Sequence, residues 1–330
     1  MKILIATDAW KPQVNGVVRC LESTIAELEK KGHEVLVVSP LNFRSFAYPL
    51  YKEVRFSIFP KRKMKKILRD FSPDRVHIST EGPIGLAARS LCKKQGLEFT
   101  SAYHTHFPQY LKQHLGIPEF VTWKYMKWFH SSSLKVLASS ETTAQMLKAH
   151  GISKAVGWTR GIDRTVFFPR ENSEFENMER PILLHVGRVS QEKNIDAFLK
   201  LNVSGTKVVV GDGPQRKQLE EKFPNAVFLG WRFGESLASA YSGADVLVFP
   251  SRSDTFGMVM IESLACGTPI AAFPVCGPVD IVENGVNGEM NEDLSIAISR
   301  ALSVSRERCL ESSQKWSWEN AAEMLINKPI

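Results

Sequence analysis

Two pairs of charged residues in the second half of the chain have the types and spacing of a ligand site. Arg188 and Lys193 follow an apolar run at residues 181–186, and Asp254 and Glu262 stand eight residues apart beside a second apolar run. Cationic side chains make strong charge-assisted contacts with phosphate oxygens. Carboxylates accept hydrogen bonds, so they can take the hydroxyls of a ribose or a hexose. Together the pairs indicate a site for a sugar attached to a nucleoside diphosphate.

A loop near the N-terminus offers a second place for a phosphate or a sugar. Residues 7–19 leave a first apolar segment and lead into an amphipathic one, with Asn15 and Gly16 at the junction. A glycine at a helix start lets backbone N–H groups approach such a ligand. The loop lacks the G-x-G-x-x-G pattern, which argues against a nicotinamide or flavin enzyme.

Short apolar segments alternate with amphipathic ones almost from end to end, which is typical of parallel α/β layers. Strands are expected near residues 2–7, 34–39, 75–78, 98–103 and 134–138, and then near 182–186, 207–210, 226–229, 246–249 and 269–272. Each half can build its own doubly wound sheet, with ligands at the carboxyl ends of the strands.

The chain has 330 residues, which favours two domains over one. An acidic, aperiodic segment between Gly161 and Glu179 is the expected boundary, so we predict domains at residues 1–165 and 166–312. A cleft between two such domains is a preferred place for a small-molecule site.

Positive charge is concentrated in the first half. Residues 1–160 carry 25 Lys and Arg against 12 Asp and Glu, a net charge of +13, whereas the remainder is net −6. This imbalance indicates a nucleic acid, an acidic substrate or an anionic membrane as partner, or simply aids solubility. The densest run, residues 61–69, can form a helix with an apolar strip at Met64, Ile67 and Leu68. Such a helix can lie on anionic lipid, or it can be an ordinary solvated helix.

Localisation follows from what the chain lacks. No apolar run is long enough to span a bilayer, and charges at Lys2 and Asp8 come too early for a signal peptide. The five cysteines are scattered, without metal or redox spacing, which fits a reducing cytosol.

Six segments, in order along the chain, resemble motifs of the family 4 retaining glycosyltransferases. They are Asp8-Ala-Trp-Lys-Pro-Gln-Val-Asn-Gly-Val-Val, Tyr103-His-Thr-His-Phe, Arg160-Gly-Ile-Asp163, Val186-Gly-Arg188 with Lys193, Val210-Gly-Asp-Gly-Pro214, and the segment from Asp254 to Glu262. Residues 271–280 look most like bacterial membrane glycolipid synthases and GDP-mannose-dependent mannosyltransferases. The resemblance implies the α/β GT-B architecture, in which two doubly wound Rossmann-like domains face a central cleft. Residues 313–330 resemble the family's last helix, which crosses back to the N-terminal domain.

The resemblance implies a role for each charged residue of the second half. Arg188 and Lys193 bind the donor diphosphate and act in catalysis, because charge on the leaving group grows in the transition state. Glu262 holds the ribose hydroxyls. Asp254 stands where many members have Glu, contacts the transferred sugar and is also assigned to catalysis; its shorter side chain leaves the preferred hexose open. Further donor contacts fall to Trp231, Arg232, Phe256, Gly257 and Met258.

In the first half the resemblance places the catalytic residue His104 beside the transferred sugar. Arg160, Asn15 and Gly16 are also assigned to the donor. His104 and His106 make a poor metal site, since no carboxylate cluster lies near them in the sequence. The chain has no Asp-x-Asp motif, so we expect no metal and no other cofactor.

These expectations combine into one function, a cytoplasmic retaining α-glycosyltransferase bound peripherally to the inner membrane. It would move a hexose from a UDP- or GDP-sugar to a lipid hydroxyl of diacylglycerol or a glycolipid. An anionic membrane surface would be a partner, with possible interfacial contacts from Phe43, Phe46, Tyr48, Tyr51, Trp123 and Trp128.

Three alternatives stay open at this point. The same chemistry can act on a soluble or envelope polysaccharide acceptor. A nucleic-acid-binding protein could use the basic half, but no known binding motif occurs, so no nucleic acid partner is expected. A catalytically idle sugar-nucleotide sensor is supported only by Asp254 in place of the usual Glu.

Overall fold

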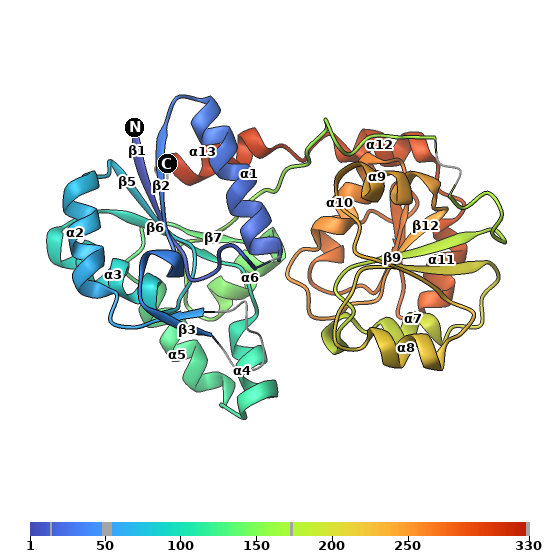
Figure 1. Ribbon diagram of the computed structural model, residues 1–330, viewed down its shortest axis with the longest axis horizontal. Helices are drawn as coiled ribbons and strands as arrows, with labels where there is room; N and C mark the ends of the chain where they lie inside the picture. Colours follow the sequence, from blue (N-terminus) through green and yellow to red (C-terminus); the bar gives the residue numbers. More distant parts are fainter. Residues whose placement is uncertain (14, 48–54, 172–173, 328–330) are drawn as a thin grey trace. The chain divides into compact units, whose positions relative to one another are not determined.

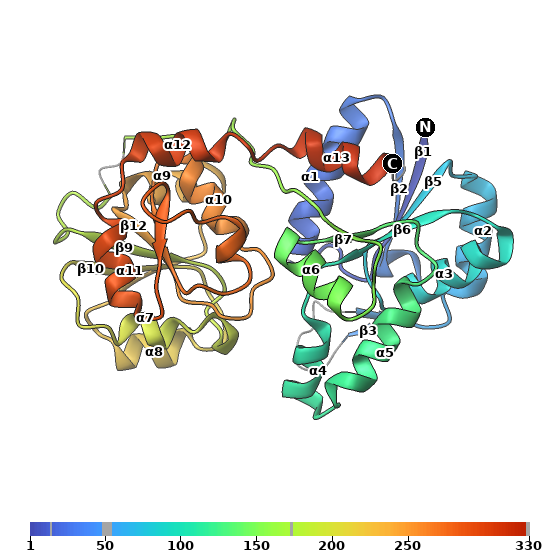
Figure 2. The same ribbon diagram turned by 180° about the vertical axis from the view of Figure 1, so that it is seen from behind.

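The chain folds into two compact units, each built around its own parallel sheet (Figures 1 and 2). A computed structural model describes residues 1–330 except 14, 48–54, 172–173 and 328–330. Unit 1 comprises Met1–Gly161 with Trp318–Ile330, and unit 2 comprises Ile162–Ser317.

Unit 1 contains a six-stranded parallel sheet in the order β2-β1-β5-β6-β7-β8. Its strands are β1 (Lys2–Ala6), β2 (Glu34–Val38), β5 (Arg75–Ile78), β6 (Phe99–Tyr103), β7 (Val136–Ala138) and β8 (Ala155–Gly157). Its helices are α1 (Gly16–Lys30), α2 (Lys61–Phe71), α3 (Pro83–Gln95), α4 (Phe107–Leu115), α5 (Glu119–His130), α6 (Glu141–Ala149) and α13 (Trp318–Ile326). A separate antiparallel pair consists of β3 (Ser45–Ala47) and β4 (Arg55–Ser57).

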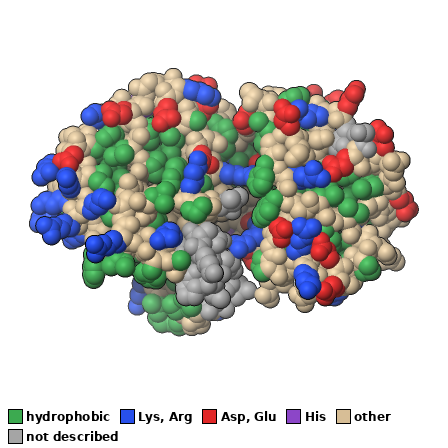
Figure 3. All heavy atoms as spheres, in the orientation of Figure 1, with side chains coloured by type: hydrophobic (Ala, Val, Ile, Leu, Met, Phe, Trp, Pro, Cys, Tyr) green, Lys and Arg blue, Asp and Glu red, His purple; other side chains and the backbone are tan. Residues whose placement is uncertain are grey.

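The basic run at residues 61–69 lies in α2, but its apolar strip faces the protein. Met64 and Leu68 are buried in the unit 1 core with residues of β1 and α3, and Ile67 packs against the same cluster. The strip is therefore not available to a membrane, which corrects that part of the lipid-surface hypothesis. The basic side chains remain exposed, and Figure 3 shows Lys and Arg gathered where α2 lies in Figure 1.

Unit 2 repeats the architecture with a parallel sheet in the order β11-β10-β9-β12-β13-β14. Its strands are β9 (Ile182–Val186), β10 (Thr206–Val210), β11 (Val227–Gly230), β12 (Val246–Phe249), β13 (Ile270–Ala272) and β14 (Gly288–Met290). Its helices are α7 (Ile195–Leu199), α8 (Arg216–Lys222), α9 (Gly234–Gly243), α10 (Met258–Ala265), α11 (Leu294–Ala301) and α12 (Arg306–Ser313).

The unit 2 sheet is buried on both faces, as is normal for a parallel sheet. Ile182 and Leu184 of β9 belong to the core formed with α9, α10 and α12, whereas Leu183 belongs to the core formed with α7, α8 and α11. Lys193 and Asp254, discussed below, lie beyond the carboxyl ends of these strands, between β9 and α7 and between β12 and α10.

The chain passes between units at different residues from those expected. It leaves unit 1 after Gly161 rather than residue 165, and returns at Trp318 rather than residue 313. Unit 2 extends beyond residue 312 because of packing. Cys309 of α12 is buried in unit 2, and Trp316 lies edge-on against Phe256, with ring centroids 5.3 Å apart. Helix α13 itself packs on unit 1.

No helix among the residues described is long and apolar enough to cross a bilayer.

Candidate active site

Two of the expected site residues meet at the carboxyl edge of the unit 2 sheet. Lys193 lies in the loop after β9 and Asp254 in the loop after the neighbouring strand β12. The Lys193 ammonium donates to both carboxylate oxygens of Asp254, at 2.6 and 2.9 Å. The two side chains are 24% and 23% exposed, so a ligand can reach the pair. Arg188 begins the same loop as Lys193 and is partly exposed.

Hydrogen bonds from side chains to backbone carbonyls hold these two loops together. The Asn194 amide donates to Pro250 O at 3.0 Å, and the Ser251 hydroxyl donates to Glu192 O at 3.3 Å. A third loop packs beneath them, because a Cβ atom on Gly277 would lie 3.0 Å from Asp254 O. Gly277 has φ +95°, a conformation that favours glycine. The position of Asp254 is thus set by close backbone packing.

Asp254 is held in its ionised form. Burial alone would raise the pKa of this carboxyl, but the charge and hydrogen bonds of Lys193, with smaller contributions from Ser251 and His185, bring the pKa below its ordinary value. An ionised carboxylate accepts hydrogen bonds only. At neutral pH Asp254 can therefore bind hydroxyls but cannot donate a proton.

His185 lies on β9 near the same pair and was not among the expected site residues. Its Nδ1 is 3.2 Å from Val248 O, so this nitrogen carries the proton. Burial is the main reason that the pKa of His185 is lowered to about 4, and the Lys193 charge acts in the same direction. The side chain is neutral at physiological pH. The sequence did not indicate His185 as a site residue, because a single histidine within an apolar strand has no motif around it.

Glu262 on α10 is almost fully buried, at 3% exposed. The hydroxyl of Tyr241, on α9, donates to its Oε2 at 3.0 Å. This carboxylate therefore has a hydrogen-bond partner within unit 2, a tyrosine that the sequence analysis did not single out.

The three residues expected to contact the donor at the start of α10, Phe256, Gly257 and Met258, differ in burial. The Phe256 side chain is 6% exposed and belongs to the core, so only its backbone is open to a ligand role. Gly257 is the N-cap of α10, with φ +95°, and a Cβ there would lie 2.9 Å from Phe249 Cζ. Met258 is the first residue of α10 and is partly buried.

After β11 the structure exposes an aromatic pair. Trp231 and Phe233 are 46% and 51% exposed, and their rings stack at 6.0 Å with an interplanar angle of 18°. Arg232 between them forms an ion pair with Glu174 at 2.8 Å. Phe233, which sequence reasoning missed, doubles the flat surface available at this position.

The expected residues of unit 1 lie at the carboxyl edge of its own sheet. Asn15 caps α1, its Oδ1 accepting from Val17 N and Val18 N at 3.0 Å each, and Gly16 is exposed beside it. Arg160 is 4% exposed, and its guanidinium lies 4.4 Å from the ring centroid of Trp158. Burial lowers the pKa of Arg160.

His104 follows β6, with its ring 5.7 Å from that of Trp158. Burial lowers the pKa of His104 well below its ordinary value, and the Arg160 charge and His77 add to this effect. His104 is therefore a neutral imidazole at physiological pH, able to exchange hydrogen bonds with a hydroxyl.

Asp8, the second residue after β1, anchors the N-terminal loop. Its carboxylate accepts from Ile84 N at 2.9 Å, Gly85 N at 3.3 Å and the Thr80 hydroxyl at 2.8 Å. Burial raises the pKa of Asp8 despite these hydrogen bonds. The loop that carries Asn15 and Gly16 is thus tied to the start of α3.

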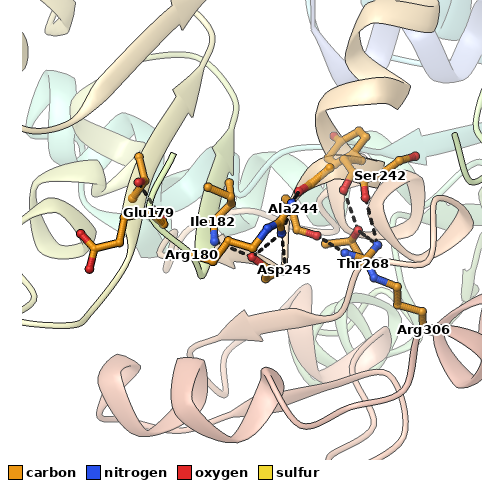
Figure 4. Close-up of polar contacts among 11 residues, drawn as sticks. Glu179, Arg180, Ile182, Ser242, Ala244, Asp245, Thr268 and Arg306 are labelled. Carbon is orange, nitrogen blue, oxygen red and sulfur yellow. Dashed lines mark hydrogen bonds and ion pairs between the residues drawn. The ribbon is translucent and has the colours of Figure 1, made fainter. Parts of the chain in front are cut away.

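Polar residues also gather at the amino edge of unit 2, around a hollow of about 430 Å³ (Figure 4). Arg180 donates to both oxygens of Asp245, at 2.7 and 2.8 Å, and Asp245 also accepts from Ile182 N at 2.6 Å. Arg306 donates to the Thr268 hydroxyl and to the carbonyls of Ser242 and Ala244. These groups bind one another and fasten α12 and β12 to β9, so the cluster is structural.

Metal ligands do not cluster in the part of the chain that the structure describes: no group of three or more His, Cys, Asp or Glu is placed to hold an ion.

Comparisons with known proteins place both units in one family. The model of Glycosyltransferase Family 4 matches residues 14–166, and the model of Glycosyl transferases group 1 matches residues 180–303. A GDP-mannose-dependent alpha-mannosyltransferase of Mycobacterium tuberculosis is 32% identical, over 86% of this chain and 81% of its own. The alpha-monoglucosyldiacylglycerol synthase of Streptococcus pneumoniae is 28% identical, over 82% of this chain and 71% of its own.

The fold agrees with these matches. Anabaena HepE, solved in complex with UDP and glucose, superposes with a TM-score of 0.74 at 17% identity, covering 98% of each chain. The two Rossmann-like units are those of the GT-B glycosyltransferases, which confirms the expected fold class. The chain belongs to glycosyltransferase family 4.

Proposed function

We propose that this enzyme transfers a hexose, with retention of configuration, from a UDP- or GDP-sugar to a hydroxyl of diacylglycerol or a glycolipid. The observation that carries the proposal is the Lys193–Asp254 pair at the carboxyl edge of unit 2, with Arg188 in the same loop as Lys193. A family member whose name specifies GDP-mannose and another whose name specifies a diacylglycerol product support the donor and acceptor classes.

Each residue at this edge has a distinct task in the proposal. Arg188 and Lys193 neutralise the diphosphate as the bond from its oxygen to the sugar C1 breaks. Asp254, held ionised, accepts hydroxyls of the transferred sugar. Because Lys193 donates to both Asp254 oxygens, a bound donor has to share the Lys193 ammonium between its phosphate and the Asp254 carboxylate. Glu262, oriented by Tyr241, takes the ribose hydroxyls.

The acceptor oxygen attacks C1 on the face from which the phosphate departs. A new C1–O bond forms, the C1–O(phosphate) bond breaks, and the acceptor proton passes to the departing phosphate oxygen. Neutral His104 donates or accepts a hydrogen bond at a sugar hydroxyl without adding positive charge next to the cationic sugar ring. Cationic side chains supply the charge stabilisation that a metal ion gives other transferases, so we propose a metal-independent reaction.

The enzyme is proposed to act at the cytosolic face of the membrane. The exposed cations of α2 form a basic surface, consisting of Lys61, Arg62, Lys63, Lys65, Lys66 and Arg69. Such a surface attracts anionic lipid by about 1 kcal/mol for each basic residue. Of the expected aromatic contacts, Phe46 and Trp128 are 54% and 51% exposed, Phe43 and Trp123 pack against unit 1, and Tyr48 and Tyr51 lie outside the described residues.

A donor panel tests the reaction. Purified protein is incubated with UDP- and GDP-sugars in EDTA, with and without diacylglycerol vesicles, and nucleotide release and glycolipid are measured. Lipid-dependent release from one donor is expected. Release without a lipid product would point to a soluble or polysaccharide acceptor instead, and a requirement for added metal would contradict the proposed role of the cations.

Vesicle sedimentation tests the membrane surface. Replacing Lys65 and Lys66 by Ala should weaken binding to anionic vesicles by about 2 kcal/mol, or roughly 30-fold. The control, Lys148→Ala with Lys217→Ala, removes the same charge from exposed positions outside α2. Equal losses in both double variants would show that α2 is not the binding surface.

A further inference from the structure

The segment that links β8 to unit 2 is fitted along helix α13. Trp158, 1% exposed, donates from Nε1 to Ala321 O at 2.9 Å, and the Thr159 hydroxyl lies 3.7 Å from the Met324 sulfur. A Cβ atom on Gly161 would lie 2.1 Å from Trp318 N, so the backbone touches the helix start. The segment and α13 therefore hold each other in place.

Helix α13 is itself fixed to unit 1 from two further sides. The Lys135 ammonium donates to Met324 O at 2.7 Å and Asn327 O at 3.1 Å, which satisfies carbonyls at the helix C-terminus. At its other end, Lys31 of the α1–β2 turn pairs with Glu319 and Glu323. The carbonyl that receives the Trp158 hydrogen bond thus belongs to a firmly held helix.

The ring of Trp158 meets the residues of the expected sugar site. His104 lies at a centroid distance of 5.7 Å and His77 at 5.8 Å, and the Arg160 guanidinium lies 4.4 Å from the ring centroid. His104, His77 and Arg160 therefore all lie around the buried ring of Trp158. After burial, Arg160 and His77 are the groups that lower the pKa of His104. After burial, the Lys135 and Arg160 charges lower the pKa of His77.

We propose that Trp158 is a positioning residue that transmits the fixed position of α13 to His104. One edge of the indole is anchored to Ala321 O, and the same ring is part of the wall that orients the imidazole and excludes water from it. An imidazole kept neutral can hydrogen-bond a sugar hydroxyl, whereas an imidazolium would repel the positive sugar ring of the transition state. The catalytic part of this inference depends on the proposed function; the structural link from α13 to His104 does not.

The test compares Trp158→Leu and Trp158→Phe with Phe120→Leu, which alters an exposed aromatic residue of the same unit. Histidine NMR titration follows His104, identified by the signal that His104→Gln removes. We expect Trp158→Leu to raise the pKa of His104 toward 6.5 and to lower kcat by about 10- to 100-fold. Affinity for UDP and GDP, which unit 2 would bind, should stay within twofold.

Trp158→Phe keeps a ring but loses the hydrogen bond to Ala321 O. We expect kcat to fall about fivefold, the equivalent of one hydrogen bond, with little change in the pKa of His104. Melting curves establish that each variant is folded, and Trp158→Phe serves as the conservative variant if the Leu variant is not.

Two results would overturn the inference. In the first, Trp158→Leu leaves both kcat and the His104 titration as in Phe120→Leu. In the second, kcat of Trp158→Leu falls while its His104 titration is unchanged, which would mean that the ring does not act through His104. If the unaltered enzyme releases nucleotide from no donor, the proposed function fails, and the titration alone decides whether Trp158 controls His104.

Discussion

Truncating Asp245 should destabilise unit 2 without affecting its carboxyl-edge site. The carboxylate accepts from Ile182 N at 2.6 Å and from Arg180 at 2.7 and 2.8 Å. Asp245→Ala leaves the buried N–H at the start of β9 without this acceptor, which costs about 1.5–3 kcal/mol for a bond to a charged group. Arg180 is 51% exposed, so loss of the ion pair adds only about 0–1 kcal/mol. The expected total is about 1.5–4 kcal/mol.

Thermal unfolding provides the assay. A loss of this size lowers Tm by about 3–16 °C for a unit of this length. Asp196→Ala is the matched control, since Asp196 also pairs with two cations, Lys200 and Lys222, but at an exposed position, and about 1 kcal/mol or less is expected. Asp245→Asn, which keeps one acceptor, should fall between the two. If Asp245→Ala and Asp196→Ala have the same Tm, the hydrogen bond to the buried N–H is not the source of the stabilisation.

Three further changes probe the candidate site and the buried histidines. Arg188→Ala should lower kcat by about 10²- to 10³-fold with a smaller change in KM, because its charge acts mainly on the leaving group; an equal loss of donor affinity would mean ground-state binding only. Tyr241→Phe should cost about 1–3 kcal/mol in urea unfolding, since buried Glu262 loses a donor. Burial lowers the pKa of His77 to about 3 and of His185 to about 4, so only the unfolded chain gains these protons below pH 6.5. The free energy of unfolding should then fall by about 1.4 kcal/mol per pH unit per histidine from pH 6 to 4, and His185→Leu should reduce this slope in unit 2 but not in unit 1.

The sequence predicted the central strands well because their apolar residues are buried on both faces. β1, β9 and β12 lie within two residues of the expected ranges. The edge strands β8 and β14 were not predicted, since each has three residues and includes a glycine. Their position depends on pairing with β7 and β13, which is a tertiary property.

Residue types at the site could be predicted, but their pairing could not. Lys193 and Asp254 are 61 residues apart and were given separate roles, yet they form one ion pair because β9 and β12 are neighbours in the sheet. In α2 the helical period correctly placed Met64, Ile67 and Leu68 on one side. It could not show that this side is covered by the unit 1 core.

The same residue types serve opposite purposes at the two ends of the unit 2 sheet. Asp245, at the amino edge, binds a backbone N–H that cannot leave, so its oxygens are committed to the fold. Asp254, at the carboxyl edge, binds an ammonium on a flexible side chain that is 24% exposed. A ligand bearing hydroxyls and phosphates can replace the second interaction at little cost, since it offers donors to the carboxylate and acceptors to the ammonium together. Composition does not distinguish the two aspartates, and the mobility of their partners is the physical reason that the proposed nucleotide-sugar site lies at the carboxyl edge.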